Sequence, residues 1–377
     1  MIPFNKPHFS GREVDYVEKA IRSGKVSGDG PFTKACQRWL EERLGAGRAF
    51  LTSSCTDALE AAALLCEIEM GDEVILPSYT FVSTANAFAL RGATLKFVDS
   101  TPTHPNMDAD MIEALVNERT RVIVPVHYAG MACDMEKIVA LGDRYNLWVV
   151  EDAAQAICST YRDRSLGTFG DLAAFSFHET KNLTSGEGGS LHVNDPNLVL
   201  RAEIVREKGT NRSAFFRGEI DKYGWVDIGS SFLSSDITAA VLLAQFEACD
   251  AIQDRRLGIW QRYWGGLSAL KSRGVLELPE LPAHATNNAH MFYIVLESLL
   301  VRTEVSERLK AEGISAPFHY QSLHSSRFFV AKHDGRSLPN SDRYSDCLLR
   351  LPLYHDLSDN DVDRICEVIR LHFGVCG

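Results

Sequence analysis

Short apolar runs separated by helix-length segments constrain the fold of this chain more than any other feature. They occupy positions 74–76, 95–98, 122–126, 147–150 and 172–177. Apolar runs with this spacing are typical of buried strands in a mainly parallel sheet, because the intervening helices cover both of its faces. The sequence therefore predicts an α/β fold.

Many of these runs end in a polar or reactive side chain. The residues concerned are Ser78, Asp99, His127, Asp152, Ser176 and His178. Ligands of open α/β sheets bind beyond the carboxyl ends of the strands, so this recurrence indicates one shared site. Any one of these residues, taken alone, is also explained as part of an ordinary loop.

The domain organisation follows from the length and from a change of pattern along the chain. A chain of 377 residues exceeds what one hydrophobic core usually supports, so we expect two domains. The pattern predicts a large domain over residues 1–250 and a smaller α+β domain over 251–377, where longer helical segments prevail. In the second domain a strand is expected over residues 316–320, and a closing helix is expected after Ser358, whose hydroxyl can cap it.

Three helices are expected around the first apolar runs. Val14, Val17 and Ile21 share one face of the first helix, and residues 32–40 carry the apolar face of the second. The third covers the Ala- and Leu-rich stretch that follows the hydroxyl-rich residues 53–56. Hydroxyl side chains at such a position are typical of a helix N-terminus.

The charge and hydropathy of the chain exclude some classes of partner. A formal net charge of −11 argues against binding to nucleic acid or to an anionic membrane, since both need a basic surface. No apolar stretch approaches the roughly 20 residues of a membrane-spanning helix, and the start of the chain does not resemble a secretion signal. We therefore expect a cytoplasmic protein that binds neither nucleic acid nor membrane.

The cysteine pattern indicates neither a disulfide framework nor a metal centre. Nine cysteines are scattered along the chain, without a C-x-x-C pair and without a His/Cys cluster at zinc spacing. His178-Glu179 begins like a zinc-protease motif, but Asn182 occupies the place of the second histidine. We expect reduced core cysteines and no metal site.

The glycine-rich motifs of common nucleotide-binding enzymes are also missing from the sequence. There is no G-x-x-x-x-G-K-[ST] loop, and the glycines at 28–30 and 186–189 do not complete a G-x-G-x-x-G after a strand. The kinase class and the nicotinamide-dependent class therefore lose their main support.

Asp152 and Lys181 are the strongest candidates for chemistry. Asp152 ends the run at 147–150, where burial of a carboxylate is costly unless it meets a cation. The protonated pyridine nitrogen of pyridoxal 5′-phosphate (PLP) is one such cation, and Lys181 could bind the aldehyde of the same cofactor. Taken singly, Asp152 could cap the turn at 153–154, and Lys181 could be a solvated surface residue.

Other residues supply the remaining parts of a PLP site. Backbone N–H groups at Ser54-Cys55-Thr56, at a helix N-terminus, suit a phosphate, and Ser176 could add a hydroxyl. Phe81 could lie flat on a heteroaromatic ring. Their ordered occurrence with Asp152 and Lys181 favours a PLP-dependent enzyme over a series of unrelated structural roles.

Three of these segments resemble the signature of the DegT/StrS family of sugar aminotransferases. They are Asp152-Ala153-Ala154-Gln155, the stretch from Phe175 to Asn182, and Gly186-Glu187-Gly188-Gly189. The resemblance extends from residues 2–5 to residues 351–354, nearly the whole chain. It implies the type I PLP-transferase fold, with a large domain and a smaller C-terminal domain.

The resemblance also implies roles for individual residues. Lys181 would hold PLP as a Schiff base and act as general base, Asp152 would pair with the pyridinium, and Gln155 would lie against the cofactor. Cys55, Thr56 and Ser176 would hold the phosphate, while Phe81 would cover the ring. Many relatives carry Tyr-Asn where this chain has Ser230-Ser231, so Ser231 takes the place of an Asn that reaches the neighbouring subunit's cofactor.

Within the family, the segments 77–86, 125–130 and 206–212 are most similar to the WecE/RffA type. This similarity implies transfer of an amino group from L-glutamate to C4 of dTDP-4-keto-6-deoxyglucose. The product would be dTDP-4-amino-4,6-dideoxygalactose, for cell-surface polysaccharide synthesis. Arg212, Tyr320 and His324 are the candidate contacts of the nucleotide-linked keto sugar, and a homodimer with shared active sites is expected.

Three alternatives remain at this stage. The first is amination of another sugar carbon or of another nucleotide sugar. The second is PLP-dependent sugar dehydration, although relatives with that activity replace the Schiff-base lysine with histidine, and Lys181 is present. The third is a PLP-fold binding or regulatory protein without turnover, against which the intact lysine, aspartate and glycine motifs count.

Overall fold

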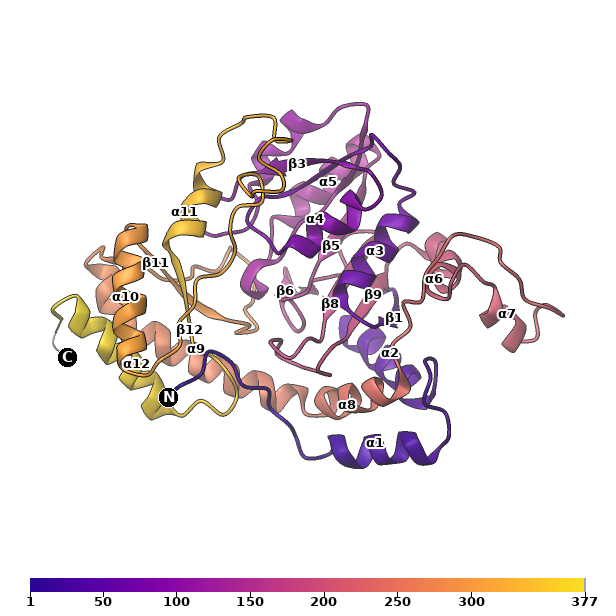
Figure 1. The fold of residues 1–377 in the computed structure, drawn as a ribbon, viewed down its shortest axis with the longest axis horizontal. Coiled ribbons are helices and arrows are strands. Elements are labelled where there is room, and N and C mark those ends of the chain that lie inside the picture. The colour runs from indigo at the N-terminus through magenta and orange to yellow at the C-terminus, as the bar shows by residue number, and fades with distance from the viewer. Residues whose placement is uncertain (376–377) are drawn as a thin grey trace.

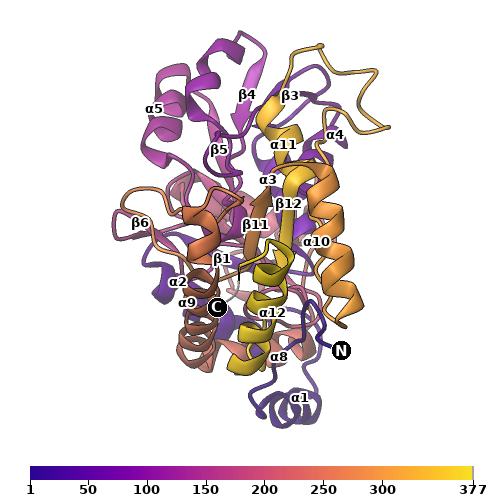
Figure 2. The same cartoon turned by 90° about the vertical axis from the view of Figure 1, so that its left-hand side faces the viewer.

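The fold is built around a seven-stranded sheet with a three-stranded sheet beside it, as the computed structural model of residues 1–375 shows (Figures 1 and 2). The large sheet has the order β1-β9-β8-β5-β4-β2-β3. Its strands are β1 (Arg48–Thr52), β2 (Glu73–Pro77), β3 (Thr94–Val98), β4 (Thr120–Ile123), β5 (Trp148–Asp152), β8 (Leu172–Ser176) and β9 (Gly189–Val193). The five strands from β3 to β8 are parallel, whereas β9 and β1 are antiparallel to their neighbours. The predicted α/β class is confirmed.

Helices cover both faces of the large sheet, and successive strand residues divide between them. In β2, Ile75 packs on one face, whereas Val74 and Leu76 pack on the other. One face is covered by α2 (Pro31–Leu44), α5 (Met135–Tyr145) and α8 (Asp236–Glu247). The opposite face is covered by α3 (Cys55–Leu65), α4 (Val82–Ala89) and α6 (Val199–Arg206). This two-sided burial explains why the strands are almost wholly apolar.

The C-terminal part forms a smaller layer of an antiparallel sheet with helices. The strands are β10 (Leu276–Glu277), β11 (Phe292–Leu296) and β12 (Leu348–Leu351), and the helices are α9 (Cys249–Ser272), α10 (Leu299–Ala311), α11 (Pro339–Cys347) and α12 (Asp359–His372). The other elements are α1 (Glu13–Arg22), α7 (Arg212–Phe216), the hairpin β6 (Thr160–Tyr161) and β7 (Arg164–Ser165), and the turns η1 (Ala109–Met111), η2 (Glu113–Leu115), η3 (Tyr128–Gly130) and η4 (Pro196–Leu198).

The proposed division at residue 250 falls at the beginning of α9 and stays a prediction. Helix α9 leads from the large sheet to the smaller one (Figure 1). Ile2, at the other end of the chain, packs in the apolar cluster of the C-terminal part, and its N–H bonds the Gly313 carbonyl at 2.8 Å. Within residues 1–375, no helix has the length and apolarity needed to cross a membrane.

Two expectations about the C-terminal part have opposite outcomes. The expected strand over residues 316–320 is wrong, because this segment is irregular. Pro317 has no N–H to donate to a ladder, and its carbonyl accepts a single bond from Arg350 N at 3.1 Å. The expected cap of the closing helix is confirmed, since the Asp361 N–H donates to Ser358 Oγ at 3.1 Å.

The first helix does not bury the apolar face that its sequence suggests. Val14 is 77% exposed and Ile21 is 56% exposed, whereas Glu13 and Ala20 are buried. The Glu13 carboxylate accepts hydrogen bonds from the Ser10 N–H at 2.8 Å and from Gln245 Nε2, on α8, at 2.7 Å. This buried anchor turns α1 so that its apolar stripe faces outward.

Candidate active site

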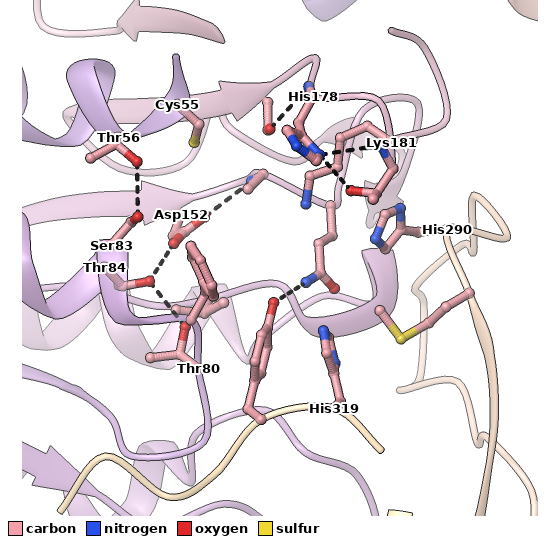
Figure 3. Close-up of a pocket in the computed structure, with 18 of the residues that line it drawn as sticks. Cys55, Thr56, Thr80, Ser83, Thr84, Asp152, His178, Lys181, His290 and His319 are labelled. Atoms are coloured by element: carbon pink, nitrogen blue, oxygen red, sulfur yellow. Dashed lines mark hydrogen bonds between the residues drawn. The ribbon is translucent and has the colours of Figure 1, made fainter. Parts of the chain in front are cut away.

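A cavity of about 590 Å³ opens at the carboxyl ends of the large sheet, between the two sheets (Figure 3). Among the strand-end residues singled out above, Asp152, Ser176 and His178 line it. The other three lie outside the cavity and serve structural contacts: Ser78 bonds His324, Asp99 accepts from the start of α11, and His127 pairs with Glu151. A cavity therefore lies where the shared site was predicted, and fewer strand ends contribute to it than expected.

The N-terminus of α3 forms one wall of the cavity. Ser54 caps this helix, because its Oγ accepts from the Asp57 N–H at 3.0 Å, and Cys55 and Thr56 line the cavity. A Cβ on Gly189 would lie 2.4 Å from the Cys55 nitrogen, so glycine there lets β9 approach the helix end. The positive end of the helix dipole and unused N–H groups at this wall suit a phosphate.

Asp152 ends β5 with its carboxylate in the cavity wall and is only 5% exposed. Thr84 Oγ1 donates to Asp152 Oδ2 at 2.6 Å, and the Ala154 N–H donates to Oδ1 at 3.1 Å. Among the described residues, Asp152 makes no ion pair. A buried carboxylate that is hydrogen-bonded but lacks a cation suits a ligand that carries the positive charge.

Lys181 lies in the turn that follows β8 and lines the same cavity (Figure 3). Its backbone N–H bonds the His178 carbonyl at 2.9 Å, which helps to fix the turn. Burial lowers the pKa of the Lys181 amine, partly offset by the negative charge of Asp152. A lysine with a lowered pKa is neutral over a wider pH range, as an amine that attacks an aldehyde or carries a proton must be.

Two aromatic side chains and an amide form the wall near α4. Phe81 precedes α4, lines the cavity and is 54% exposed, with its ring centroid 6.0 Å from that of Tyr320. Gln155 Oε1 accepts from the Ala129 N–H at 2.6 Å, and its Nε2 donates to the Tyr320 hydroxyl at 3.0 Å. These bonds fix the position of Gln155 at the cavity edge.

His290 is a cavity residue that the sequence did not suggest. Asn182 Nδ2 donates to Gln253 Oε1 at 2.9 Å and to the Asn288 carbonyl at 2.7 Å, so Asn182 Oδ1 faces His290 Nδ1, 2.9 Å away. Nδ1 must therefore carry the proton, and burial lowers the pKa of His290 well below its usual value. The neutral ring keeps Nε2 as a hydrogen-bond acceptor beside Lys181 (Figure 3).

Arg350 and His319 are two further contributions from the C-terminal part. Arg350 lies on β12. Among the described residues, Lys181 and Arg350 are the only lysine and arginine that line the cavity. Its Nη2 donates to the Phe318 carbonyl at 2.9 Å, and its guanidinium lies 4.4 Å from the centre of the Phe4 ring. His319 Nδ1 lies 2.7 Å from the Tyr128 hydroxyl. Arg350 thus offers a positive charge to an anionic substrate group.

Three predicted contacts lie outside this cavity. His324 is 7% exposed and its Nδ1 lies 2.7 Å from Ser78 Oγ, so it is held in the protein interior. Arg212 begins α7 and lines a separate cavity. Its Nη1 donates to Glu207 Oε1 at 3.0 Å. Ser231 is exposed and forms an isolated bridge with Glu207. Tyr320 is the only predicted substrate contact that lines the cavity.

The cavity contains the parts that PLP requires. A helix N-terminus suits the phosphate, a carboxylate without a cation suits the ring nitrogen, and a lysine with a lowered pKa suits the aldehyde. The carboxylate of Asp152 is the most specific of these, because no side chain of the described chain neutralises it. Fold and site together define a PLP-dependent enzyme of the type I transferase fold.

Residues 7–370 match the model of the DegT/DnrJ/EryC1/StrS aminotransferase family, and the chain belongs to that family. The protein is therefore a PLP-dependent aminotransferase. The match covers both sheets, so it agrees with the family resemblance seen in the sequence.

Solved structures of similar proteins extend this result. The aminotransferase TlmJ from Streptoalloteichus hindustanus is 32% identical, with a TM-score of 0.90 and 99% of each chain covered. The PLP form of the putative sugar aminotransferase Spr1654 from Streptococcus pneumoniae is 27% identical, with a TM-score of 0.88 and 98% of each chain covered. DesV from S. venezuelae is 28% identical, with a TM-score of 0.90, and the match covers 100% of this chain and 99% of DesV. These relatives support sugar aminotransferase activity.

Proposed function

We propose that this enzyme transfers the amino group of L-glutamate to C4 of dTDP-4-keto-6-deoxyglucose, giving dTDP-4-amino-4,6-dideoxygalactose. The observation that carries the proposal is the similarity of segments 77–86, 125–130 and 206–212 to transaminases with this activity. The aminated sugar would serve cell-surface polysaccharide synthesis, with the reaction taking place in the cytoplasm.

Residues of this chain account for the main steps of such a transfer. Bound PLP supplies an electron-withdrawing ring that stabilises negative charge beside the transferred nitrogen. Asp152 would keep the ring nitrogen protonated, and the N-terminus of α3 would hold the phosphate. The Lys181 amine, which lines the cavity and has a lowered pKa, would carry the proton that moves to and from the carbon beside the transferred nitrogen. Both half-reactions use one cavity, which predicts ping-pong kinetics.

A second, basic cavity supports the proposal that two subunits share each active site. It has a volume of about 860 Å³ and is lined by Arg212 and by several lysines and arginines. Among them, Lys34, Arg38 and Lys208 make no ion pair with any residue that the structure describes. We propose that this face of one subunit completes the partner's site and binds the diphosphate, since the catalytic cavity offers only Arg350 besides Lys181 among residues 1–375.

The segment around α7 supports the same homodimer. It projects from the body of the protein (Figure 1) and exposes aromatic rings, with Phe216 69% exposed and Trp225 83% exposed. Neighbouring aliphatic residues Val226 and Ile228 are about half exposed. A projecting segment with this much apolar surface is typical of a protein interface. Ser231 follows this segment directly in the sequence, and we propose that it reaches the neighbouring subunit's cofactor.

The direct test is an incubation of the purified holoenzyme with L-glutamate and a panel of nucleotide keto sugars. We expect 2-oxoglutarate and one aminated product, identified by mass spectrometry and NMR as the 4-amino sugar with the galacto configuration. The Lys181→Ala variant serves as the inactive control. Amination of a 3-keto sugar, or of a different nucleotide sugar in preference, would contradict the proposed specificity and favour the alternative substrates within the same family.

A further inference from the structure

Two cysteines that the proposed function does not use, Cys158 and Cys249, lie in contact outside the cavity. Cys158 follows β5 by six residues, Cys249 begins α9, and their Sγ atoms are 3.3 Å apart. Cys249 is 2% exposed, whereas Cys158 is partly exposed. The pair therefore combines a thiol within reach of solvent with a second thiol buried directly behind it.

The charges around the pair favour a reactive Cys158. The hydrogen bond from Cys249 lowers the pKa of the Cys158 thiol, and the nearby Arg43 guanidinium lowers it further. The same shared bond raises the pKa of Cys249, so the proton stays on the buried sulfur. Arg43 Nη2 also donates to Asp250 Oδ1 at 2.7 Å, which fixes the guanidinium beside the two sulfur atoms.

The other described cysteines lack this combination. Burial raises the pKa of each of them, and all except Cys55 are buried: Cys36, Cys55, Cys66, Cys133, Cys347 and Cys366. Cys55 belongs to the cofactor cavity. Within residues 1–375, Cys158 is thus the cysteine whose exposure and electrostatic surroundings both suit a nucleophilic thiolate.

We propose that Cys158 and Cys249 form a peroxide-reactive dithiol that is oxidised reversibly to an intramolecular disulfide. The Cys158 thiolate attacks one oxygen of hydrogen peroxide and breaks the O–O bond, which gives a sulfenic acid and hydroxide. Cys249 sulfur then attacks Cys158 sulfur, displaces hydroxide and loses its proton. Two thiols are oxidised, and one peroxide is reduced to two water molecules.

The two sulfur atoms need to move only a short distance to form the disulfide. A disulfide has an S–S distance of about 2.05 Å, so the sulfur atoms need to approach by roughly 1.2 Å. That movement is small compared with the displacement of a sulfur atom in an ordinary rotamer change. Asn288 Nδ2 donates to the Gln155 and Ile157 carbonyls at 2.7 and 2.8 Å, which holds the loop on which Cys158 lies.

The test uses reduced holoenzyme that carries Cys376→Ser, so that the C-terminal thiol does not react. Limited hydrogen peroxide should remove two titratable thiols per chain and lower the mass by 2 Da. A tryptic map should join the peptides of Cys158 and Cys249, and dithiothreitol should restore both thiols. Cys36→Ser should behave like the parent protein, because it leaves the pair intact.

Matched variants separate the pair from general oxidation. Cys158→Ser and Cys249→Ala should each abolish the cross-linked peptide, with circular dichroism confirming that both variants fold. Arg43→Gln should slow the loss of the Cys158 thiol, since its charge stabilises the thiolate. A cross-link between other cysteines, or stepwise oxidation of Cys158 to sulfinic acid without any cross-link, would overturn the proposal.

Discussion

Two consecutive acidic residues at the end of β5, Glu151 and Asp152, have similar side chains but different surroundings. Glu151 and Asp152 point to opposite faces, because side chains alternate along a strand. Burial alone would raise the pKa of Glu151, but hydrogen bonds from His127 and from backbone N–H groups, Gly170 among them, lower it. Glu151 is therefore fully satisfied inside the protein, whereas Asp152 has no cation among the described residues.

The first prediction concerns this unpaired carboxylate. Asp152→Asn should lower turnover by more than about 10²-fold, or roughly 3 kcal/mol of barrier, because an amide does not keep the ring nitrogen protonated. Phosphate contacts should persist, so PLP binding should weaken much less than turnover. Asp254→Asn is the matched control, since Asp254 is exposed on α9 and does not line the cavity. Steady-state kinetics measures turnover, and absorbance measures the amount of bound PLP. Near-normal turnover would refute the role assigned to Asp152.

The second prediction concerns Lys181. Borohydride treatment of the yellow holoenzyme should fix PLP to Lys181, and peptide mapping should find the label at that residue alone. Lys181→Ala should still bind PLP at the N-terminus of α3 but lose about 10²- to 10⁴-fold or more in turnover, because no other lysine in the described part of the chain lines the cavity. Lys271→Ala, on the exposed side of α9, should match the unmodified enzyme. A label on a different lysine would contradict the site.

At the scale of elements, the contact between β9 and the start of α3 shapes the proposed phosphate site. A Cβ on Gly189 would lie 2.4 Å from the Cys55 nitrogen and 2.5 Å from the Ser54 carbonyl oxygen. These are backbone atoms, which a side-chain rotation does not move away. The helix end therefore approaches the sheet only because residue 189 is glycine, and the same contact positions Cys55 and Thr56 in the cavity wall.

The third prediction follows from that contact. Gly189→Ala should displace the start of α3, destabilise the protein by about 1–3 kcal/mol and weaken PLP binding by roughly tenfold or more. Gly265→Ala, in α9, is the matched control because its new Cβ meets no atom within 4 Å. Thermal unfolding and PLP titration measure the two effects. Unchanged PLP affinity in Gly189→Ala would show that the helix end does not hold the phosphate.

At the scale of the whole molecule, the single chain contains the cofactor residues but separates them from other predicted contacts. Lys181 and Asp152 line the catalytic cavity, whereas Arg212 lines the basic cavity and Ser231 lies outside both. The exposed apolar residues of the segment around α7 lie between Arg212 and Ser231 in the sequence, and Trp225 is the most exposed of them. A two-fold dimer, the commonest assembly of such chains, would cover this surface and bring the separated residues to one site.

The fourth prediction tests this arrangement by complementation. A Lys181→Ala chain mixed with an Arg212→Ala chain should recover activity, since one hybrid site then contains both intact residues. Each variant alone should be inactive or strongly impaired, and a mixture of Lys181→Ala with Lys181→Gln should recover nothing. Sedimentation analysis should show a dimer at the assay concentration. A fully active monomer would rule out the shared site, and failed complementation by a proven dimer would remove Arg212 from it.

The sequence by itself determined the fold class and predicted the centre of the site, because both depend on local patterns. Strand length, apolar character and strand-end polarity are properties of a few neighbouring residues, and they placed Asp152, Ser176 and Lys181 at one end of the sheet. The family motifs then agreed with the family match over residues 7–370. The cap at Ser358 was predictable for the same local reason.

The tertiary structure alone decided which distant side chains meet in the cavity. His290 precedes β11 and Arg350 lies on β12, both more than 100 residues beyond Lys181, and neither occupies a position that local periodicity marks. The same long-range packing kept His324 in the interior and turned the apolar stripe of α1 outward around Glu13. Side-chain convergence of this kind depends on how the two sheets pack together, which no short pattern in the sequence encodes.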